Sequence, residues 1–275
     1  MILYASQKTD IPYYYMNWFM HRIEEGFFDT RGDKQSEYIR HELKNIEKIM
    51  FFTKDPSKFI SISDVNRKIH TDYELITSIA MYDKFYDSRV SPKNKIFEAI
   101  KKARYIVGVK NGFCYGPIFA SPVHDIDFHI NQFAFLCRTL KKYVSHIYVS
   151  FYDGPDVDKY GIVIKNFCED ERQLILDGFK KVAIEQEVEF NLKPEPNKDI
   201  DSIDIGEENS CPSGCTYCIC NRQSNTAKSK YLIHNPESSL LFGTLSYDAN
   251  IISASSIAKK KTTKAEPMAN LLDLL

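Results

Sequence analysis

Short apolar runs alternate with amphipathic stretches along most of this chain. Residues 47–54 (EKIMFFTK) are almost continuously apolar, which is typical of a strand covered on both faces. Similar runs predict further strands at residues 1–6, 73–82, 105–113, 146–153, 188–194 and 201–207. Patterns with helical spacing lie between them, at residues 11–26, 91–103, 126–143 and 170–186. This alternation predicts an α/β fold with a mainly parallel sheet, either a full or a partial (β/α) barrel.

Polar residues directly follow several of these predicted strands. They are Lys8, Thr9, Asp10, Lys54, Asp55 and Asp153. Because a barrel builds its active site from the loops that follow its strands, we expect these side chains to meet at one rim. The candidates for catalysis among them are Lys8, Asp10, Lys54 and Asp153. The alternative is structural: Thr9 or Asp10 caps the helix predicted to begin at residue 11, and the others are surface charges.

The composition of the chain changes after Gly243. Residues 253–275 (SASSIAKKKTTKAEPMANLLDLL) are small, polar and basic until the last five positions. We therefore expect one domain over residues 1–245 and a flexible basic tail over residues 246–275. The terminal LLDLL is either a partner-docking peptide or, as is more common for such runs, a frayed helical end.

The bulk composition fits a folded protein with a substantial core. The chain has 275 residues, of which 43% are hydrophobic, and a formal net charge of −1. That charge excludes attraction to nucleic acid or anionic membranes through bulk charge alone. The N-terminus turns polar after five residues without a basic lead, unlike a signal peptide, and no apolar run reaches the roughly 18 residues of a membrane span. We expect a cytoplasmic protein without membrane contact.

Four of the seven cysteines lie in residues 209–221 (NSCPSGCTYCICN). Thiols stay reduced in the cytoplasm, so such a group indicates a metal site or catalysis before disulfides. Cys211, Cys215 and Cys218 have the spacing C-x3-C-x2-C, and the small residues between them let the backbone wrap around a cubic iron–sulfur cluster. Zinc is the alternative, although structural zinc sites prefer paired C-x2-C units and need a fourth ligand.

Tyr217 precedes the third cysteine, and the motif C-x3-C-x-aromatic-C resembles the signature of radical S-adenosylmethionine (radical SAM) enzymes. The resemblance implies a 4Fe-4S cluster whose fourth iron is open and binds the amino and carboxylate groups of S-adenosylmethionine. It also implies that electron transfer cleaves a C–S bond to give a deoxyadenosyl radical, which abstracts hydrogen from a substrate. That superfamily normally carries the motif near the N-terminus, after the first strand, whereas here the motif lies beyond residue 210.

The late position of the cysteines resembles the family called domain of unknown function 1848, which carries radical-SAM-like cysteines at its C-terminal end. The start of the chain, SQKTDIP at residues 6–12, resembles the family pattern S-x-R/K-T-D-I-P. Further segments that resemble the family are FFTKDP (51–56), VSFYD (149–153), SIDIGEENSCPSGCTYC (202–218) and HNPESSLLFG (234–243). The resemblance implies a barrel in which the cluster-bearing strand and loop come last in the chain, as in a circular permutation.

The chain departs from the family pattern in two places. FCYGPI at residues 113–118 replaces W-R-Y-D-P-I, so Cys114 and Gly116 stand where the family has Arg and Asp. Cys114 follows a predicted strand and could face the site. YCICN at residues 217–221 replaces Y-C-Y-A-N and introduces Cys220. Cys220 is either a small buried hydrophobe, which we favour, or a fourth ligand that closes the cluster and suits electron transfer or structure.

The sequence therefore predicts a 4Fe-4S protein with radical S-adenosylmethionine-type chemistry on an unknown substrate. We assign Tyr217 and Asn221 to cofactor binding. A nucleotide or nucleic acid is conceivable as the substrate, by analogy with the cysteine loops of DNA photoproduct lyases, and an electron donor is required if the protein is catalytic. The alternatives are a noncatalytic iron–sulfur module in a complex, docked to a protein partner through its tail, and a zinc-stabilised binding protein.

Overall fold

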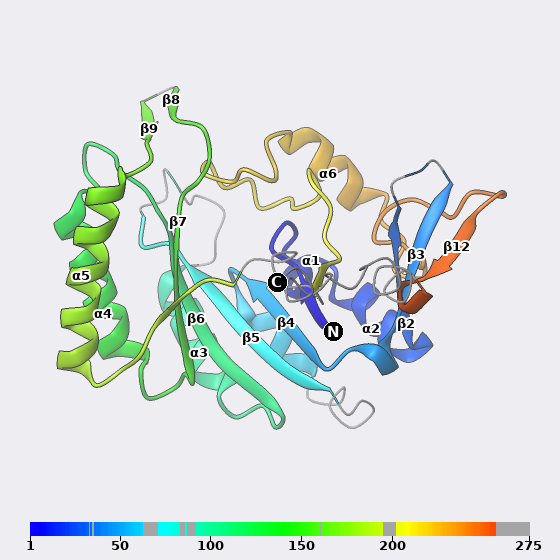
Figure 1. Ribbon diagram of the computed structural model, residues 1–275, viewed down its shortest axis with the longest axis horizontal. Helices are drawn as coiled ribbons and strands as arrows, with labels where there is room; N and C mark the ends of the chain where they lie inside the picture. Colours follow the sequence, from blue (N-terminus) through cyan, green and yellow to red (C-terminus); the bar gives the residue numbers. More distant parts are fainter. Residues whose placement is uncertain are drawn as a thin grey trace, which may run out of the picture.

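The computed structural model describes residues 1–32, 34, 36–62, 71–82, 86, 92–159, 161–194 and 202–256. The strands of its main sheet are β1 (Ile2–Ala5), β4 (Lys48–Thr53), β5 (Asp72–Ile79), β6 (Val109–Ile118), β7 (His146–Phe151), β10 (Asn191–Leu192) and β11 (Ser202–Asp204). They follow the order β10-β7-β6-β5-β4-β1-β11, and every neighbouring pair is parallel. The sheet forms a half-barrel, which confirms the predicted partial (β/α) barrel (Figure 1).

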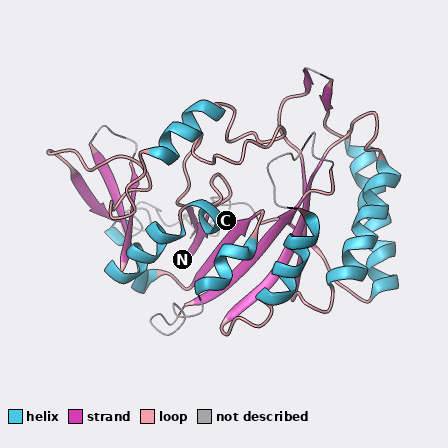
Figure 2. Ribbon diagram, turned by 180° about the vertical axis from the view of Figure 1, so that it is seen from behind, coloured by secondary structure: helices cyan, strands magenta, loops and turns pink. Residues whose placement is uncertain are grey.

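Helices cover one face of this sheet (Figure 2). They are α1 (Ile11–Tyr14), α2 (Met16–Glu25), α3 (Lys93–Ala103), α4 (Ile126–Leu140) and α5 (Glu169–Gln186), with 3-10 turns η1 (Leu43–Asn45) and η2 (Pro56–Ile62). The helix predicted at residues 11–26 is divided at Tyr15. Its second part ends at Gly26, whose φ of +85° is a left-handed conformation that glycine adopts readily. No helix within the described residues is long and apolar enough to cross a membrane.

Apolar side chains pack on both faces of the central strands. On the helix-covered face, Leu3 and Phe51 pack with Trp18 and Phe19 of α2. The opposite face carries a second buried group, formed by Tyr4, Met50, Phe52, Ile76 and Cys114. Burial on both faces explains why these strands read as nearly continuous apolar runs in the sequence.

Strand β6 begins later and extends further than the strand predicted at residues 105–113. The chain first turns at Gly108, whose φ is +79°, and the strand then spans residues 109–118. Cys114 therefore lies within the strand, which corrects the expectation that it follows one. Its buried thiol donates to Ser150 Oγ of β7 at 3.7 Å.

A small second sheet uses part of the predicted tail. Strand β12 (Asn250–Ser253) pairs in parallel with β3 (Glu37–Glu42), which pairs antiparallel with β2 (Phe27–Arg31). Ser36 Oγ also donates to Asp248 Oδ2 at 3.0 Å. Residues 250–253 of the predicted tail therefore form a strand of this sheet, while the domain boundary expected at residue 245 stays a prediction. The LLDLL segment, like all of residues 257–275, lies outside the described residues.

Two further elements lie beyond the carboxyl ends of the main strands, at the top of Figure 1. They are the hairpin of β8 (Val157–Lys159) and β9 (Ile162–Ile164), and helix α6 (Ser224–Leu232). The chain that leaves β11 also crosses this end of the molecule before it reaches α6. The half-barrel thus carries its irregular segments at the rim where parallel strands end.

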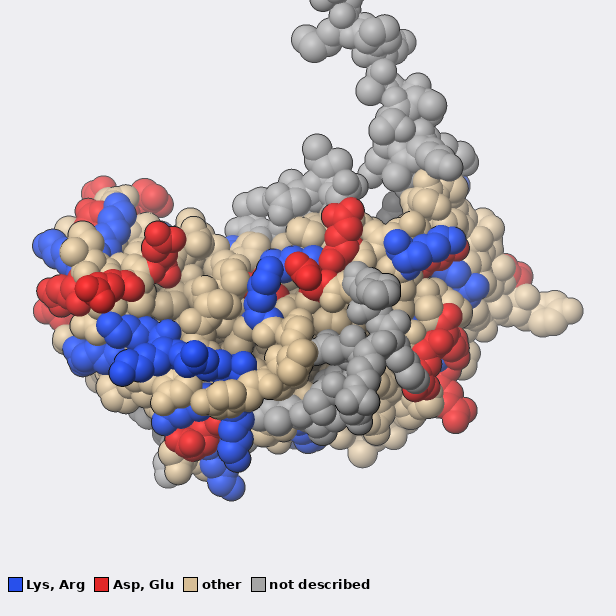
Figure 3. All heavy atoms as spheres, turned by 90° about the horizontal axis from the view of Figure 1, so that it is seen from below, with Lys and Arg blue, Asp and Glu red and all other residues tan. Residues whose placement is uncertain are grey.

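Basic side chains gather at the opposite end, where the strands begin. Figure 3 shows Lys and Arg on one side of this face. The sequence contains no Asp or Glu in residues 99–124 or 128–152. Within these ranges Lys102, Arg104 and Lys142 are exposed, and Arg104 Nη1 donates to Lys142 O, which joins the ends of α3 and α4. The protein therefore has a locally basic surface, although its formal net charge is only −1.

His129 of α4 is fully buried and uses both ring nitrogens in hydrogen bonds. Its Nε2 donates to Phe119 O at 2.9 Å, so its Nδ1 is the acceptor for Tyr115 OH at 2.7 Å. Burial lowers the pKa of His129 from 6.5 to about 4. Because the native protein binds this proton less tightly than the unfolded chain does, the stability from His129 is complete above pH 6.5 and is lost as the pH falls toward 4.

We expect His129→Gln to flatten this part of the pH dependence. Through this one group, the wild type should lose about 3 kcal/mol of unfolding free energy on acidification. The variant should be less stable at neutral pH, because glutamine reproduces the two hydrogen bonds poorly, but it should lose less on acidification. Urea unfolding at several pH values measures both slopes, and parallel curves for the two proteins would contradict this assignment.

Candidate functional site

The cysteine loop, residues 209–221, follows the point where neighbouring strands β1 and β11 end. Asp204 is the last residue of β11. Its carboxylate accepts hydrogen bonds from Ser6 Oγ, from Gln7 N at 3.0 Å and from Gly206 N at 2.8 Å. Burial raises the pKa of Asp204, because the charged form is removed from water. These bonds join the turn after β1 to the turn after β11.

Ser210 holds the start of the cysteine loop against the segment that follows β1. Its Oγ lies 2.5 Å from Thr9 Oγ1 and donates to Glu207 O at 2.5 Å. Its carbonyl oxygen accepts from Tyr15 OH at 2.6 Å. Ser210 is completely buried. The backbone immediately before Cys211 is therefore fixed by partners about 200 residues earlier in the chain.

Asn221 connects the two ends of the cysteine loop. Its Oδ1 accepts hydrogen bonds from Ser210 N and Cys211 N, both at 2.7 Å. Its Nδ2 donates to Lys8 O at 2.8 Å. Asn221 is 7% exposed, so its amide lies inside the protein. The residue assigned to cofactor binding from the sequence thus has extensive contacts within the chain itself.

The tip of the loop packs against residues that follow β4. Cys218 N donates to Cys215 O at 3.1 Å, which closes a tight turn. Tyr217, between them, is buried in an aromatic group with Phe119. Lys54 Nζ hydrogen-bonds to Tyr217 OH and lies 4.4 Å from the centre of the tyrosine ring. The structure therefore brings the candidates Lys54 and Tyr217 together.

Asp10 caps α1 and lies close to Cys211. Its Oδ1 accepts from Tyr13 N at 3.2 Å and its Oδ2 accepts from Lys54 N at 2.9 Å. Burial raises the pKa of Asp10 to about 6, although these hydrogen bonds act in the opposite direction. Burial, and next the charge of Asp10, raise the pKa of the Cys211 thiol. Asp10 is therefore a helix cap that also acts electrostatically on the first cysteine.

Lys8 and Asp153 occupy different surroundings. Lys8 contributes its backbone carbonyl to Asn221, and its side chain is half-buried. Asp153 follows β7, and its side chain is 67% exposed and pairs with Arg172 Nη2 of α5 at 2.8 Å. The strand-end set is thus divided, because Asp153 belongs to a surface ion pair while the other three candidates lie at the cysteine loop.

Cys220 lies at the base of the loop, close to Cys218. Its carbonyl oxygen accepts from Asn209 N at 2.8 Å, which pairs the two ends of the loop. Burial first, and then the Cys218 sulfur, raise the pKa of Cys220 to about 11. The fourth-ligand alternative for Cys220 therefore requires a direct test.

The three cysteines match an iron–sulfur cluster in the chemistry of their donor atoms. Cys211, Cys215 and Cys218 are half-buried cysteines on one loop, separated by small residues. Cys211 Sγ donates to Ser213 Oγ at 3.3 Å. Within the described residues, no group of three or more His, Cys, Asp or Glu side chains is arranged to hold a metal ion. Cluster binding therefore requires the three thiols to turn toward a common point.

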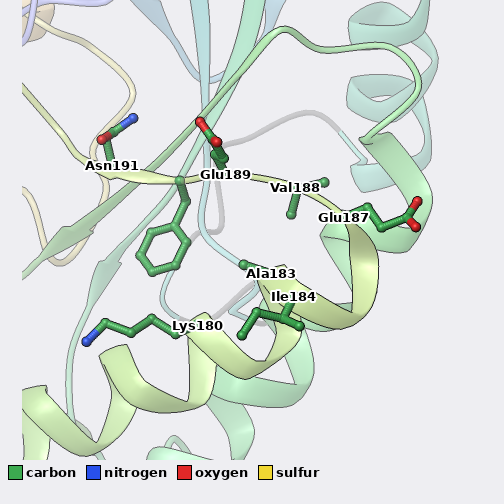
Figure 4. Close-up of a pocket in the computed structure, with 8 residues that line it drawn as sticks. Lys180, Ala183, Ile184, Glu187, Val188, Glu189 and Asn191 are labelled. Atoms are coloured by element: carbon green, nitrogen blue, oxygen red, sulfur yellow. The ribbon is translucent and has the colours of Figure 1, made fainter.

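An open groove at the other edge of the sheet lacks this chemistry. It is lined by Lys180, Ala183, Ile184 and residues 187–191, between the end of α5 and β10. In Figure 4 the Lys180 ammonium and the Glu187 carboxylate point in opposite directions. Strand β10 is the edge strand opposite β11. We therefore place the candidate site at the cysteine loop.

Similar solved structures belong to spore photoproduct lyase. They include a single-site mutant, the enzyme complexed with dinucleoside spore photoproduct, and a double mutant with bound AdoMet and dinucleoside spore photoproduct. Their sequences are 15%, 15% and 14% identical to this chain, and the TM-score is 0.37 for each. Each match covers 53% of this chain and 50% of the other, so the chain spans about half the length of these proteins.

The comparison with protein families concerns the part of the chain before the cysteine loop. No curated protein matches the chain. The family described as Domain of unknown function (DUF1848) matches residues 2–199, which is more than half of the 275 residues. The protein therefore belongs to the family Domain of unknown function (DUF1848).

Proposed function

We propose that this protein holds a 4Fe-4S cluster through Cys211, Cys215 and Cys218 and performs radical S-adenosylmethionine-type chemistry. The observation that carries this proposal is the position of three thiols on one anchored loop, directly after the strand that neighbours β1. This is the rim of a parallel half-barrel where such folds assemble their active sites. Three thiolates leave one iron without a protein ligand, which is the open position that a catalytic metal site needs.

The surrounding side chains are suited to such a centre. A cluster held by Cys211, Cys215 and Cys218 would supply the electron needed for reductive cleavage of a C–S bond in S-adenosylmethionine. Lys54 Nζ lies 4.4 Å from the centre of the Tyr217 ring and provides a positive charge that suits a cofactor carboxylate. Tyr217 is 5% exposed, so it excludes water from one side of the loop. We further propose that the protein acts in the cytoplasm, where thiols stay reduced, and receives electrons from a separate donor.

A noncatalytic iron–sulfur module is the second candidate, and the position of Cys220 favours it. The Cys218 sulfur is close enough to Cys220 to affect its pKa. If Cys220 supplied a fourth thiolate, every iron would have a protein ligand and none would be open to the cofactor. Such a closed cluster suits electron transfer or structural stabilisation.

Anaerobic purification followed by iron and sulfide assays tests the metal. We expect about four iron and four sulfide ions per chain, the content of one cubic cluster. S-adenosylmethionine is then added to the protein reduced with dithionite, and 5′-deoxyadenosine is measured by mass spectrometry. Formation of 5′-deoxyadenosine supports the catalytic proposal. A full cluster without that product favours the closed module, and zinc in place of iron rejects both.

A further inference from the structure

The side-chain amide of Asn221 uses all four of its hydrogen-bonding positions within the protein. A carboxamide can accept two hydrogen bonds at oxygen and donate two at nitrogen. Oδ1 accepts from Ser210 N and Cys211 N, both at 2.7 Å. Nδ2 donates to Lys8 O at 2.8 Å and to Cys218 Sγ at 3.4 Å. No position on this amide is left for a cofactor atom.

The orientation of the amide is determined by its neighbours. Two backbone N–H groups face Oδ1, and a backbone carbonyl faces Nδ2. The reversed orientation would place the amide N–H groups of Asn221 against two other donors and its oxygen against an acceptor. Only one orientation therefore satisfies the network.

Asn221 connects three segments that must be in place for the cysteines to share one metal centre. These segments are the backbone at the first cysteine, the third cysteine itself, and the segment after β1 at Lys8. A fully paired buried amide favours one arrangement of its partners, because any displacement leaves a polar group without a hydrogen bond. The loop then loses its conformational entropy during folding, so this loss does not oppose the later binding of metal.

The contact with Cys218 adds an electronic effect. An N–H group that points at a ligand sulfur is an outer hydrogen bond, and such bonds tune both the affinity and the potential of iron–sulfur centres. Asn221 is positioned to act in this way on only one of the three cysteines, because its other bonds reach backbone atoms.

From these contacts we infer that Asn221 is a positioning residue that holds the cysteine loop ready for its metal. This inference rests on the proposed function above, and it replaces the direct cofactor contact assigned from the sequence. Asn221 acts through Cys211 and Cys218, and its removal reduces metal binding without removing any ligand.

Asn221→Ala tests whether the Asn221 side chain holds the start of the cysteine loop in place. The measurement is hydrogen exchange in the metal-free protein. We expect the Ser210 and Cys211 amides to exchange at least about tenfold faster in the variant, because both lose their acceptor. Asn111→Ala is the matched control. Asn111 is 4% exposed and donates from Nδ2 to two backbone carbonyls at 2.9 and 3.0 Å, near the start of β6. Its replacement should leave exchange at Ser210 and Cys211 unchanged.

Asn221→Asp separates the hydrogen bonds that the side chain accepts from those that it donates. Its carboxylate still accepts from Ser210 N and Cys211 N, so exchange protection should be retained. It cannot donate to Lys8 O or to Cys218 Sγ, and it adds a negative charge beside the sulfur. We expect iron affinity to fall about tenfold or more in both Asn221 variants, and to stay at the wild-type value in Asn111→Ala.

The outcomes are decisive in each case. Wild-type exchange rates at Ser210 and Cys211 in folded Asn221→Ala would overturn the inference, as would wild-type iron affinity in either Asn221 variant. If Asn221→Ala does not fold, the iron affinity of the similarly sized Asn221→Asp decides the matter. Absence of iron from the wild type itself would reject the proposed function, while the exchange measurement would still decide whether Asn221 holds the loop.

Discussion

Replacement of Cys215 by alanine is expected to reduce the iron bound after anaerobic purification to about a tenth of the wild-type amount or less. Cys215 is the middle thiol of the three, and Cys218 N donates to its backbone carbonyl at the tip of the loop. Without its sulfur, a cubic cluster would have two irons without protein ligands, and such a cluster is readily lost. Cys211→Ala and Cys218→Ala should have the same effect, measured as iron and sulfide per chain.

Two other cysteines provide controls. Cys168 is exposed at the start of α5, so Cys168→Ala should bind the wild-type amount of iron. Cys220→Ala should also keep its cluster and form 5′-deoxyadenosine at the wild-type rate if Cys220 is only a small buried side chain. Loss of iron in Cys220→Ala would instead identify Cys220 as the fourth ligand. Iron at the wild-type amount in Cys215→Ala would end the three-thiolate assignment.

The main sheet could be predicted because its strands are buried on both faces. Strand β4 packs Ile49 and Phe51 on one face and Met50 on the other. Its sequence is therefore a nearly continuous apolar run, which is the pattern that predicts such a strand. The small sheet was harder to predict, because β3 (EYIRHE) holds only two apolar residues and β12 is four residues long. Composition also misled the prediction at residues 250–253, which are polar at both ends but acquire a partner in β3.

The cysteines of the candidate site could be predicted from spacing, but the residues that position them could not. Ser210 carries no signal of its own, and its contacts with Thr9 and Tyr15 exist only because β1 and β11 are adjacent. Asp204 could have been found by the rule that selected Asp10, since both follow or end a strand. Spacing in the sequence identifies possible ligands, whereas parallel pairing of the first and last strands determines what surrounds them.

Because β1 and β11 are paired, the turns that follow these two strands hold the start of the cysteine loop in place. Gly206 lies at a crowded point of this junction. A Cβ atom at this position would overlap Ser6 Oγ and would lie 2.7 Å from Ser6 Cβ and 3.1 Å from Asp204 Oδ1. Real Cβ atoms essentially never show contacts under 3.0 Å, so either the turn after β11 or Ser6 must move. Displacement of that turn shifts the start of the loop that carries the three thiols.

Gly206→Ala is therefore expected to destabilise the protein by about 2 kcal/mol or more and to reduce bound iron, because it separates the two strand ends. Ser6→Gly removes the two Ser6 atoms that the new methyl group would meet, and these are its two shortest contacts. The double variant should recover at least about 1 kcal/mol relative to the sum of the single effects, a coupling measured by urea unfolding in a double-mutant cycle. Gly161→Ala is the control, because no atom of the described residues beyond its chain neighbours lies within 4 Å of its Cβ position, and its φ of +77° is what opposes the change. It should cost about 1 kcal/mol, show no coupling to Ser6→Gly and keep the wild-type iron content.

Additive effects of Gly206→Ala and Ser6→Gly would mean that the two strand ends are not in contact. The cysteine loop would then lack the support that this structure assigns to it.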